Sequence, residues 1–152
     1  LTVTMKNTSN NQGHDGGGTY QSYLRFLYPP ETELVGVSID GAVATPSSSV
    51  VTGTSDNIFS VGVPMYVPPK SEHKITLSTK RTLPANFISS GTYEYAIRKQ
   101  PGVDSLPWHV IVEYPQDWRA TADVDLAKPG WLQYNTDLSR DARLTVLFET
   151  DL

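Results

Sequence analysis

The sequence predicts an all-β fold, most simply an antiparallel two-sheet β-sandwich of about eight to ten strands. Three observations lead to this prediction. Apolar and polar residues alternate with a period of two along most of the chain. Turn-forming residues separate the alternating segments at short, fairly regular intervals. Only one segment has a pattern that a helix of more than one turn could also explain.

Alternation predicts strands at Leu1–Lys6, Val35–Ile39, Ile75–Lys80, Tyr93–Arg98, Trp108–Tyr114 and Leu144–Phe148. Two further strands are expected at Tyr20–Tyr28, which is dense in aromatic and other β-forming residues, and at the run Ile58–Val67. The pair Asp40-Gly41 is a hairpin turn signal, and Pro64 inside its segment predicts an edge strand or a bulge. Even spacing of short strands favours an immunoglobulin-like, Greek-key arrangement.

One segment, Asp117–Ala127, is open to two interpretations. Asp117 could cap a helix that Lys128-Pro129-Gly130 would end. However, the apolar residues from Trp118 to Leu126 fall on every second position, with Arg, Thr and Asp between them. That segregation is too regular for helical spacing, so we predict a strand here.

Two long stretches of low complexity, Asn7–Gly18 and Ala42–Asp56, are predicted to be loops. The length of 152 residues fits a single β-sandwich domain, 1–152. The chain begins at Leu1, without a methionine and already in a strand pattern. We therefore expect it to be a fragment of a longer protein.

Composition excludes several classes of partner. The chain has no cysteine, which excludes disulfides, thiolate metal sites and a cysteine nucleophile. Its formal net charge is −4 and no cluster of Lys and Arg occurs, so we expect no binding to nucleic acid. No apolar run approaches the ~20 residues of a membrane span, so we expect no membrane insertion by this domain.

No set of residues has the spacing of a catalytic or metal site. His14, His73 and His109 are too far apart in sequence for a two-histidine motif. The best pair of carboxylates, Asp123 and Asp125, is a weak candidate for Ca²⁺, but the sequence has no Asp-x-Asp-x-Asp-Gly loop around it. We therefore predict that the domain is not an enzyme and needs no metal or other cofactor.

The aromatic residues offer an alternative function. Alternation places Trp108 and Trp118 in the core. Trp131 follows a Pro-Gly pair, and with Tyr134 it is the weak candidate for a carbohydrate-binding platform. An odd spacing of three puts the two rings on opposite faces of an extended strand, and Tyr20 and Tyr23 have the same spacing.

Several motifs occur in an order that resembles a known family. They are Tyr20–Pro29, Glu33–Val37, Val67–Ser71, Tyr93–Gly102 with its Lys-Gln-Pro-Gly ending, and Tyr134–Asp141. Together they resemble the C-terminal β-domain of a large family of bacterial membrane-anchored envelope proteins, classed as a domain of unknown function. The likeness spans roughly residues 1–150 and carries over no catalytic residue.

The resemblance implies an extracytoplasmic location at the bacterial cell surface or envelope, with a membrane anchor outside this segment. We therefore expect a non-catalytic structural or protein-interaction domain, whose partner is another envelope protein. The alternative is a carbohydrate-binding module for cell-wall or capsular glycan. For Lys-Gln-Pro-Gly we expect a structural role, because proline ends strand pairing and glycine permits the turn that follows.

Overall fold

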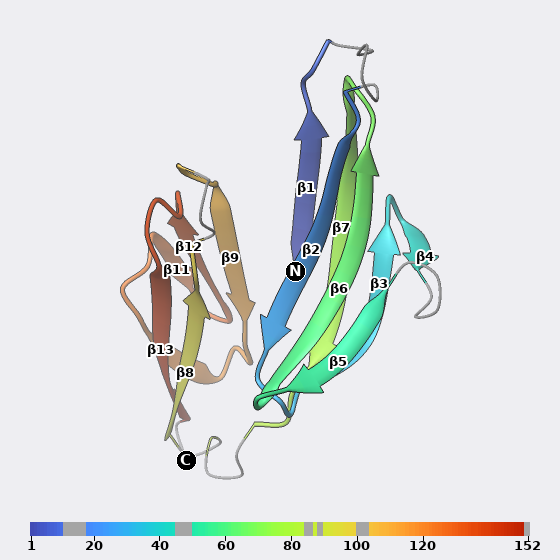
Figure 1. Ribbon diagram of the computed structural model, residues 1–152. Coiled ribbons are helices and arrows are strands. Elements are labelled where there is room, and N and C mark those ends of the chain that lie inside the picture. The colour runs from blue at the N-terminus through green and yellow to red at the C-terminus, as the bar shows by residue number, and fades with distance from the viewer. Residues whose placement is uncertain (11–17, 45–49, 84–86, 88–89, 100–103, 151–152) are drawn as a thin grey trace. The chain divides into compact units, whose positions relative to one another are not determined.

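The computed structural model describes residues 1–10, 18–44, 50–83, 87, 90–99 and 104–150 (Figure 1). In these residues all the sheets are antiparallel, and no α-helix is present. The thirteen strands are β1 Thr2–Asn7, β2 Tyr20–Tyr28, β3 Glu33–Ile39, β4 Ala42–Ala44, β5 Val51–Ser55, β6 Ile58–Val67, β7 Ser71–Lys80, β8 Ser90–Ile97, β9 Trp108–Glu113, β10 Trp118–Thr121, β11 Leu126–Lys128, β12 Trp131–Thr136 and β13 Ala142–Thr150. The predicted all-β, sandwich-like class is therefore confirmed.

The strands divide between two compact units, Leu1–Thr82 (unit 1) and Leu83–Leu152 (unit 2). Unit 1 contains sheet A, in the order β1-β7-β3-β4, and sheet B, in the order β2-β6-β5. Unit 2 contains sheet C, β10-β13-β8, and sheet D, β11-β12-β9. Each unit has its own hydrophobic cluster. That residues 1–152 form one domain stays a prediction.

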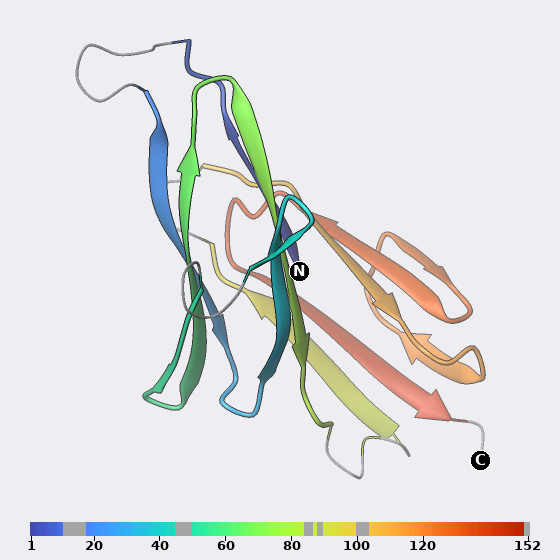
Figure 2. The ribbon, with the colours of Figure 1, turned by 90° about the vertical axis from the view of Figure 1, so that its right-hand side faces the viewer.

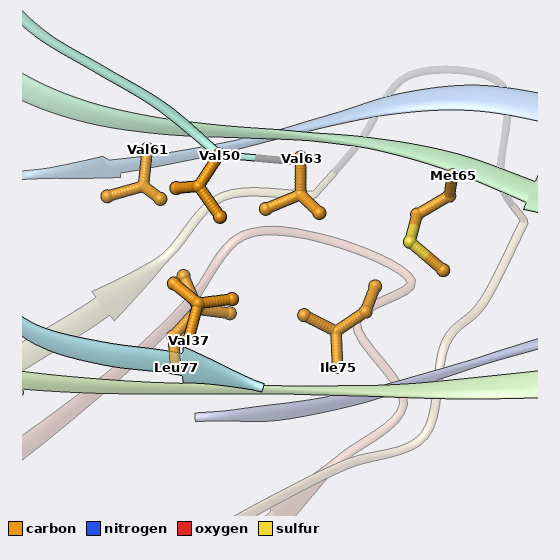
Figure 3. Close-up of a cluster of buried hydrophobic side chains, with 7 residues drawn as sticks. All are labelled: Val37, Val50, Val61, Val63, Met65, Ile75 and Leu77. Atoms are coloured by element: carbon orange, nitrogen blue, oxygen red, sulfur yellow. The ribbon is translucent and has the colours of Figure 1, made fainter. Parts of the chain in front are cut away.

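The core of unit 1 lies between its two sheets and is aliphatic. Figure 2 shows sheets A and B as separate layers within this unit. Seven buried side chains fill the space and point toward one another (Figure 3): Val37, Val50, Val61, Val63, Met65, Ile75 and Leu77. Six of them come from β3, β6 and β7, those of β6 and β7 at alternate positions, as a period of two requires, and Val50 directly precedes β5.

The core of unit 2 is built on aromatic rings. Phe148 of β13 lies 5.3 Å from the Tyr114 ring centroid and 5.9 Å from those of Phe87 and Trp118. Leu132, Leu144 and Val146 complete the buried cluster. Burial raises the pKa of the Tyr95 phenol, Tyr93 adds to the rise, and a hydrogen bond with Trp108 opposes it. Trp118 packs against the core as predicted, while Trp108 is half-buried and contacts Tyr95.

The segment from Trp118 to Leu126 shows how a strand prediction can be right and still incomplete. Half-buried and exposed side chains alternate from Trp118 through Asp125, which excludes the helix. The pairing is interrupted, however: β10 pairs with β13 in sheet C, whereas β11 pairs with β12 in sheet D. The chain thus crosses from one sheet to the other, as strands do at the corners of sandwiches.

Three strands lie outside the predicted set. β4 and β5 occupy parts of the predicted Ala42–Asp56 loop, and β12 occupies Trp131–Thr136. Two-residue hairpin turns explain the first two. Asp40 and Gly41 both have positive φ, as do Asp56 and Asn57, as type I′ turns require. Residues 45–49 of the same predicted loop lie outside the described part of the chain.

Pro64 lies in β6, the middle strand of sheet B. Its neighbour β5 pairs only with Ile58–Gly62, while β2 pairs with the whole of β6. In the described residues Pro64 is therefore in the half of β6 that has a strand on one side only. The predicted edge strand or bulge is wrong for β6, the middle strand, but no ladder hydrogen bond to β5 is lost at Pro64.

Candidate functional site

The exposed apolar side chains of unit 1 gather on the outer face of sheet B. Alternation directs Val61, Val63 and Met65 of β6 inward, so the residues between them face outward. The outward-facing, exposed members are Tyr23 and Leu27 of β2, Val51 of β5, and Ile58 and Tyr66 of β6. We call this surface the tyrosine face; in Figure 1 sheet B is the layer of β2, β6 and β5.

Charge is nearly absent from this sheet. Arg25 is the single charged residue in β2, β5 and β6 together. By contrast, β7 of sheet A carries Glu72, Lys74 and Lys80. The centres of protein interfaces differ from the rest of a protein surface in having few charged residues and many aromatic residues.

The ring of Tyr23 lies over Gly62. A Cβ atom placed on Gly62 would be 2.5 Å from Cζ of Tyr23, so the ring occupies the space that a side chain would fill. An aromatic ring beside a sheet glycine compensates for the missing side chain. Tyr23 nevertheless remains 56% exposed. Tyr66, which lies two positions beyond the residue opposite Tyr23 and on the same face, is 62% exposed.

The structure places Trp131 and Tyr134 on opposite faces of β12. Tyr134 packs against the core of unit 2, as its buried neighbour Leu132 does. Trp131 is half-buried, and Nζ of Lys128 lies 4.9 Å from the centre of its ring. One face of the indole is thus in contact with a cation. The two rings do not form a common platform.

Asp123 and Asp125 are both exposed, in the segment between β10 and β11. The Asp125 carboxylate accepts the backbone N–H of Asn135 at 2.6 Å, which ties this segment to β12. The side-chain oxygen of Asn135 in turn contacts Nδ1 of His109 at 2.6 Å and accepts from Gln133 at 2.9 Å. Among the described residues, no three His, Asp or Glu side chains come together as a metal site would require.

The remaining described histidine, His73, lies beside Asp40. Its Nδ1 is 2.5 Å from Oδ2 of Asp40, and Oδ1 of Asp40 accepts the backbone N–H of Lys74 at 2.8 Å. The hydrogen bond from Lys74, followed by the one with His73, lowers the pKa of Asp40. This arrangement joins the β3–β4 turn to β7, and His73 is half-buried instead of freely exposed. His14 lies outside the described residues.

Two of the motifs that carry the family resemblance contact each other. Asp141 accepts the backbone N–H of Lys99 at 2.8 Å, which joins the start of Lys-Gln-Pro-Gly to the end of Tyr134–Asp141. Residues 100–103 lie outside the described part of the chain. In a third motif, the Ser71 hydroxyl donates to the carbonyl oxygen of Pro68 at 2.7 Å and closes a turn. The described contacts of these motifs are structural.

A shallow hollow of about 430 Å³ lies on the surface of unit 2. It is lined by Tyr114, Gln116, Asp117, Trp118, Arg119, Ala120, Ala127, Lys128 and Pro129. Most of these residues are exposed, so the hollow is an open depression without the enclosed apolar walls of a small-molecule site.

A scan against protein-family models and a search of curated proteins find no match for this chain. The resemblance to the envelope-protein family therefore stays a prediction. In the described residues, no helix is both long enough and apolar enough to cross a membrane.

Proposed function

We propose that this chain is a non-catalytic, extracytoplasmic structural or protein-interaction domain of a bacterial membrane-anchored envelope protein, and that the tyrosine face is its contact surface. The observation that carries the proposal is the concentration of exposed apolar side chains on one nearly uncharged sheet. Five of these side chains share the outer face of sheet B. An exposed patch of this kind on a soluble domain marks an interaction site.

The outer face of sheet C, in unit 2, differs in charge from the tyrosine face. The outer face of sheet C carries Arg143 and Glu94, which form an exposed ion pair at 3.7 Å. It also carries Thr145, directly opposite Glu94. Such a charged and hydrated face is costly to cover, because each charge must be desolvated. Sheet B presents only Arg25 to a partner.

Site-specific photo-crosslinking in the cell envelope tests this proposal. A photoreactive amino acid replaces Val51, which is exposed on the tyrosine face, or Thr145, which is exposed on sheet C. We expect a discrete protein adduct from position 51 and none from position 145. The adduct at 51 should disappear when Tyr66→Ser is added. Equal labelling from both positions would contradict the proposal.

A second function, carbohydrate binding, is supported by a different observation on the same face. Tyr23 and Tyr66 are diagonal neighbours on adjacent strands, and both rings are more than half exposed. Aromatic side chains of this kind can stack against the apolar faces of sugar rings. These two tyrosines therefore replace Trp131 and Tyr134 as the candidates for a glycan platform.

Glycan binding has its own test. Tyr66→Ala should abolish retention on cell-wall or capsular polysaccharide without changing the melting temperature, whereas Trp131→Ala should leave retention intact. Absence of retention by the unaltered chain would remove this function. Loss of retention in Trp131→Ala alone would restore the original pair of candidates.

A further inference from the structure

The outer edge of β2 has no partner strand in the described part of the chain. β2 is the terminal strand of sheet B and pairs with β6 alone. That pairing runs through nine consecutive residues, from Tyr20 to Tyr28, without a shift in register. The opposite edge of β2 therefore presents a long, regular row of backbone N–H and C=O groups. Such an edge is a template for another strand.

β2 also lacks most of the features that protect sheet edges, and Arg25 is its one charged residue. Proteins protect an edge with proline, lysine, bulges or short strands. The edge strands β4, β5, β10 and β11 have three to five residues each. β1 contains Lys6, and β8 contains Gly91 and Glu94. β2 is the longest edge strand, and it contains no proline, glycine, lysine or acidic residue.

The inward-facing residues of β2 are incompletely covered. Leu24, Phe26 and Tyr28 are only partly buried, although the Val61 and Val63 side chains of adjacent β6 are fully buried. The difference arises because β2 has a neighbouring strand on one side only. A further strand beside β2 would cover this apolar surface, and each Å² removed from water would contribute about 25 cal/mol.

We propose that β2 pairs antiparallel with β2 of a second copy of this chain, about a two-fold axis through Leu24. The proposal goes beyond the proposed interaction function, because it adds a contact along the edge of β2 that leaves the tyrosine face free for another partner. The pairing would join two B sheets into one continuous sheet, with both tyrosine faces on the same side. Because the contact uses the same strand twice, it is a closed, isologous dimer.

The sequence of β2 selects this register. Residues that face each other across the two strands must point to the same side of the sheet. The two-fold axis must therefore pass through a residue and cannot pass between two residues. A centre at Leu24 pairs all nine residues and sets Tyr23 opposite Arg25 of the second copy. A centre at Arg25 would bring two like charges together. A centre at Tyr23 would leave Leu27 and Tyr28 outside the pairing.

The cross-strand contacts of this register are favourable on both faces. On the outer face, the Arg25 guanidinium meets the Tyr23 ring twice, once on each side of the axis, as a cation–π pair. On the inner face, Tyr20 stands opposite Tyr28, and aromatic pairs stabilise antiparallel sheets. The one charge of β2 thus has an aromatic partner in the dimer.

Two substitutions of Tyr23, one by a cationic and one by an anionic residue, test the proposal. We expect the 152-residue chain to pass from monomer to dimer in sedimentation equilibrium as its concentration rises from micromolar to millimolar. Tyr23→Lys places lysine opposite Arg25 twice and should raise the dimer dissociation constant by about tenfold or more. Tyr23→Glu removes the same ring but creates two ion pairs, so it should dimerise at least as tightly as the unaltered chain.

A double variant and a distant variant serve as controls. Tyr23→Lys with Arg25→Glu restores opposite charges and should recover the dimer. Thr145→Lys adds the same charge to sheet C and should change nothing. A chain that stays monomeric throughout would overturn the proposal, as would equal weakening by Tyr23→Lys and Tyr23→Glu.

The two proposals fail in distinguishable ways. Val51 lies on β5, on the far side of sheet B from β2, so its crosslinks report partners of the tyrosine face. A monomeric chain that still forms a specific adduct from position 51 would retain the interaction function and exclude pairing through β2. A dimer without any adduct from position 51 would retain the pairing and remove the proposed contact surface. Retention on glycan by the monomer would favour the carbohydrate function.

Discussion

The two units follow the same strand alternation but fill their cores with different side chains. The core cluster of unit 1 consists of seven buried aliphatic side chains between strands of up to ten residues. Unit 2, with shorter strands in sheet D, relies on the contacts of Phe87, Tyr114, Trp118 and Phe148. Aromatic rings bury the most surface per residue, so a smaller unit gains most from them. The alternation thus specifies which face is buried but not which packing results.

The two units also differ in net charge and in the number of apolar side chains on their surfaces. By sequence, unit 1 has six Lys and Arg against six Asp and Glu, while unit 2 has six against ten. The whole formal charge of −4 therefore resides in unit 2. Among the residues that the structure describes, nine of the thirteen large exposed apolar side chains belong to unit 1. The neutral, apolar unit is the one suited to contacts, and the acidic unit is suited to solvent.

Removing the central ring of unit 2 should have the largest effect. Phe148→Ala deletes contacts with three other rings, and we expect it to lower the free energy of unfolding by about 3–5 kcal/mol. All three tryptophans lie in unit 2, so urea unfolding followed by tryptophan fluorescence measures this unit. A change below 1 kcal/mol would mean that the ring cluster is not the core of unit 2.

The corresponding substitution in unit 1 is Ile75→Ala. Ile75 is fully buried between the sheets, and its truncation should cost about 2–5 kcal/mol. We expect far-UV circular dichroism to report the loss, while the tryptophan transition of unit 2 stays in place. If the two signals move together in both variants, the units unfold as one cooperative domain. That result would support the single domain expected from the sequence.

Substitution of one glycine in each unit should have a smaller effect on the free energy of unfolding than the two core truncations. A Cβ on Gly91 would lie 2.6 Å from Cγ of the buried Phe87, and a Cβ on Gly62 would lie 2.5 Å from Cζ of the exposed Tyr23. Phe87 is held by the core, so Gly91→Ala should cost about 1–3 kcal/mol. Tyr23 can rotate into solvent, so Gly62→Ala should change the free energy of unfolding by less than about 1 kcal/mol. Thermal unfolding of both variants measures the difference, and equal losses would contradict this account.

The sequence predicted those parts of the fold that depend on local pattern. Alternation located β7, β9 and β13, and runs of β-forming residues located β2 and β6. Asp40-Gly41 identified a hairpin whose positive φ angles only certain residues adopt readily. The local pattern missed β5, although Val51, Thr52 and Thr54 are strand-forming residues, because the adjacent run of serines suggested a loop. It could not reveal the change of sheet between β10 and β11, which depends on pairing between distant residues.

The candidate site was predicted less well for the same reason. Tyr23 and Tyr66 are far apart in sequence and become neighbours only through the register of β2 with β6. Trp131 attracted notice because it follows a turn, but Lys128 comes to lie over its ring across the β11–β12 hairpin. A single strand shows which residues share its face, while a platform needs the pairing of two.

The smallest expected effect concerns two carboxylates at turns, one in each unit. Hydrogen bonds from Lys74 and His73 lower the pKa of Asp40, and hydrogen bonds from the backbone and side chain of Ser139 lower the pKa of Asp137. A carboxylate with a lowered pKa stabilises the folded state above its unfolded pKa, and that contribution is lost as pH falls through the folded value. The window therefore lies at and below the ordinary value of 3.8.

The residues that donate hydrogen bonds to the two carboxylates lie at different distances along the sequence. We therefore expect different pH dependence for the two carboxylates. Lys74 is 34 residues from Asp40, so unfolding removes its hydrogen bond, whereas Ser139 is two residues from Asp137 and can keep part of its contact in the unfolded chain. The stability difference between the unaltered chain and Asp40→Asn should therefore shrink as pH falls through this window, and the difference for Asp137→Asn should shrink less. Because the Lys74 hydrogen bond is the largest single cause of the lowered pKa of Asp40, His73→Gln should leave part of the pH dependence in place. Melting temperatures of the three variants from neutral to acid pH measure these differences. A difference for Asp40→Asn that is constant with pH would show that its carboxylate is not held by β7 in the folded state.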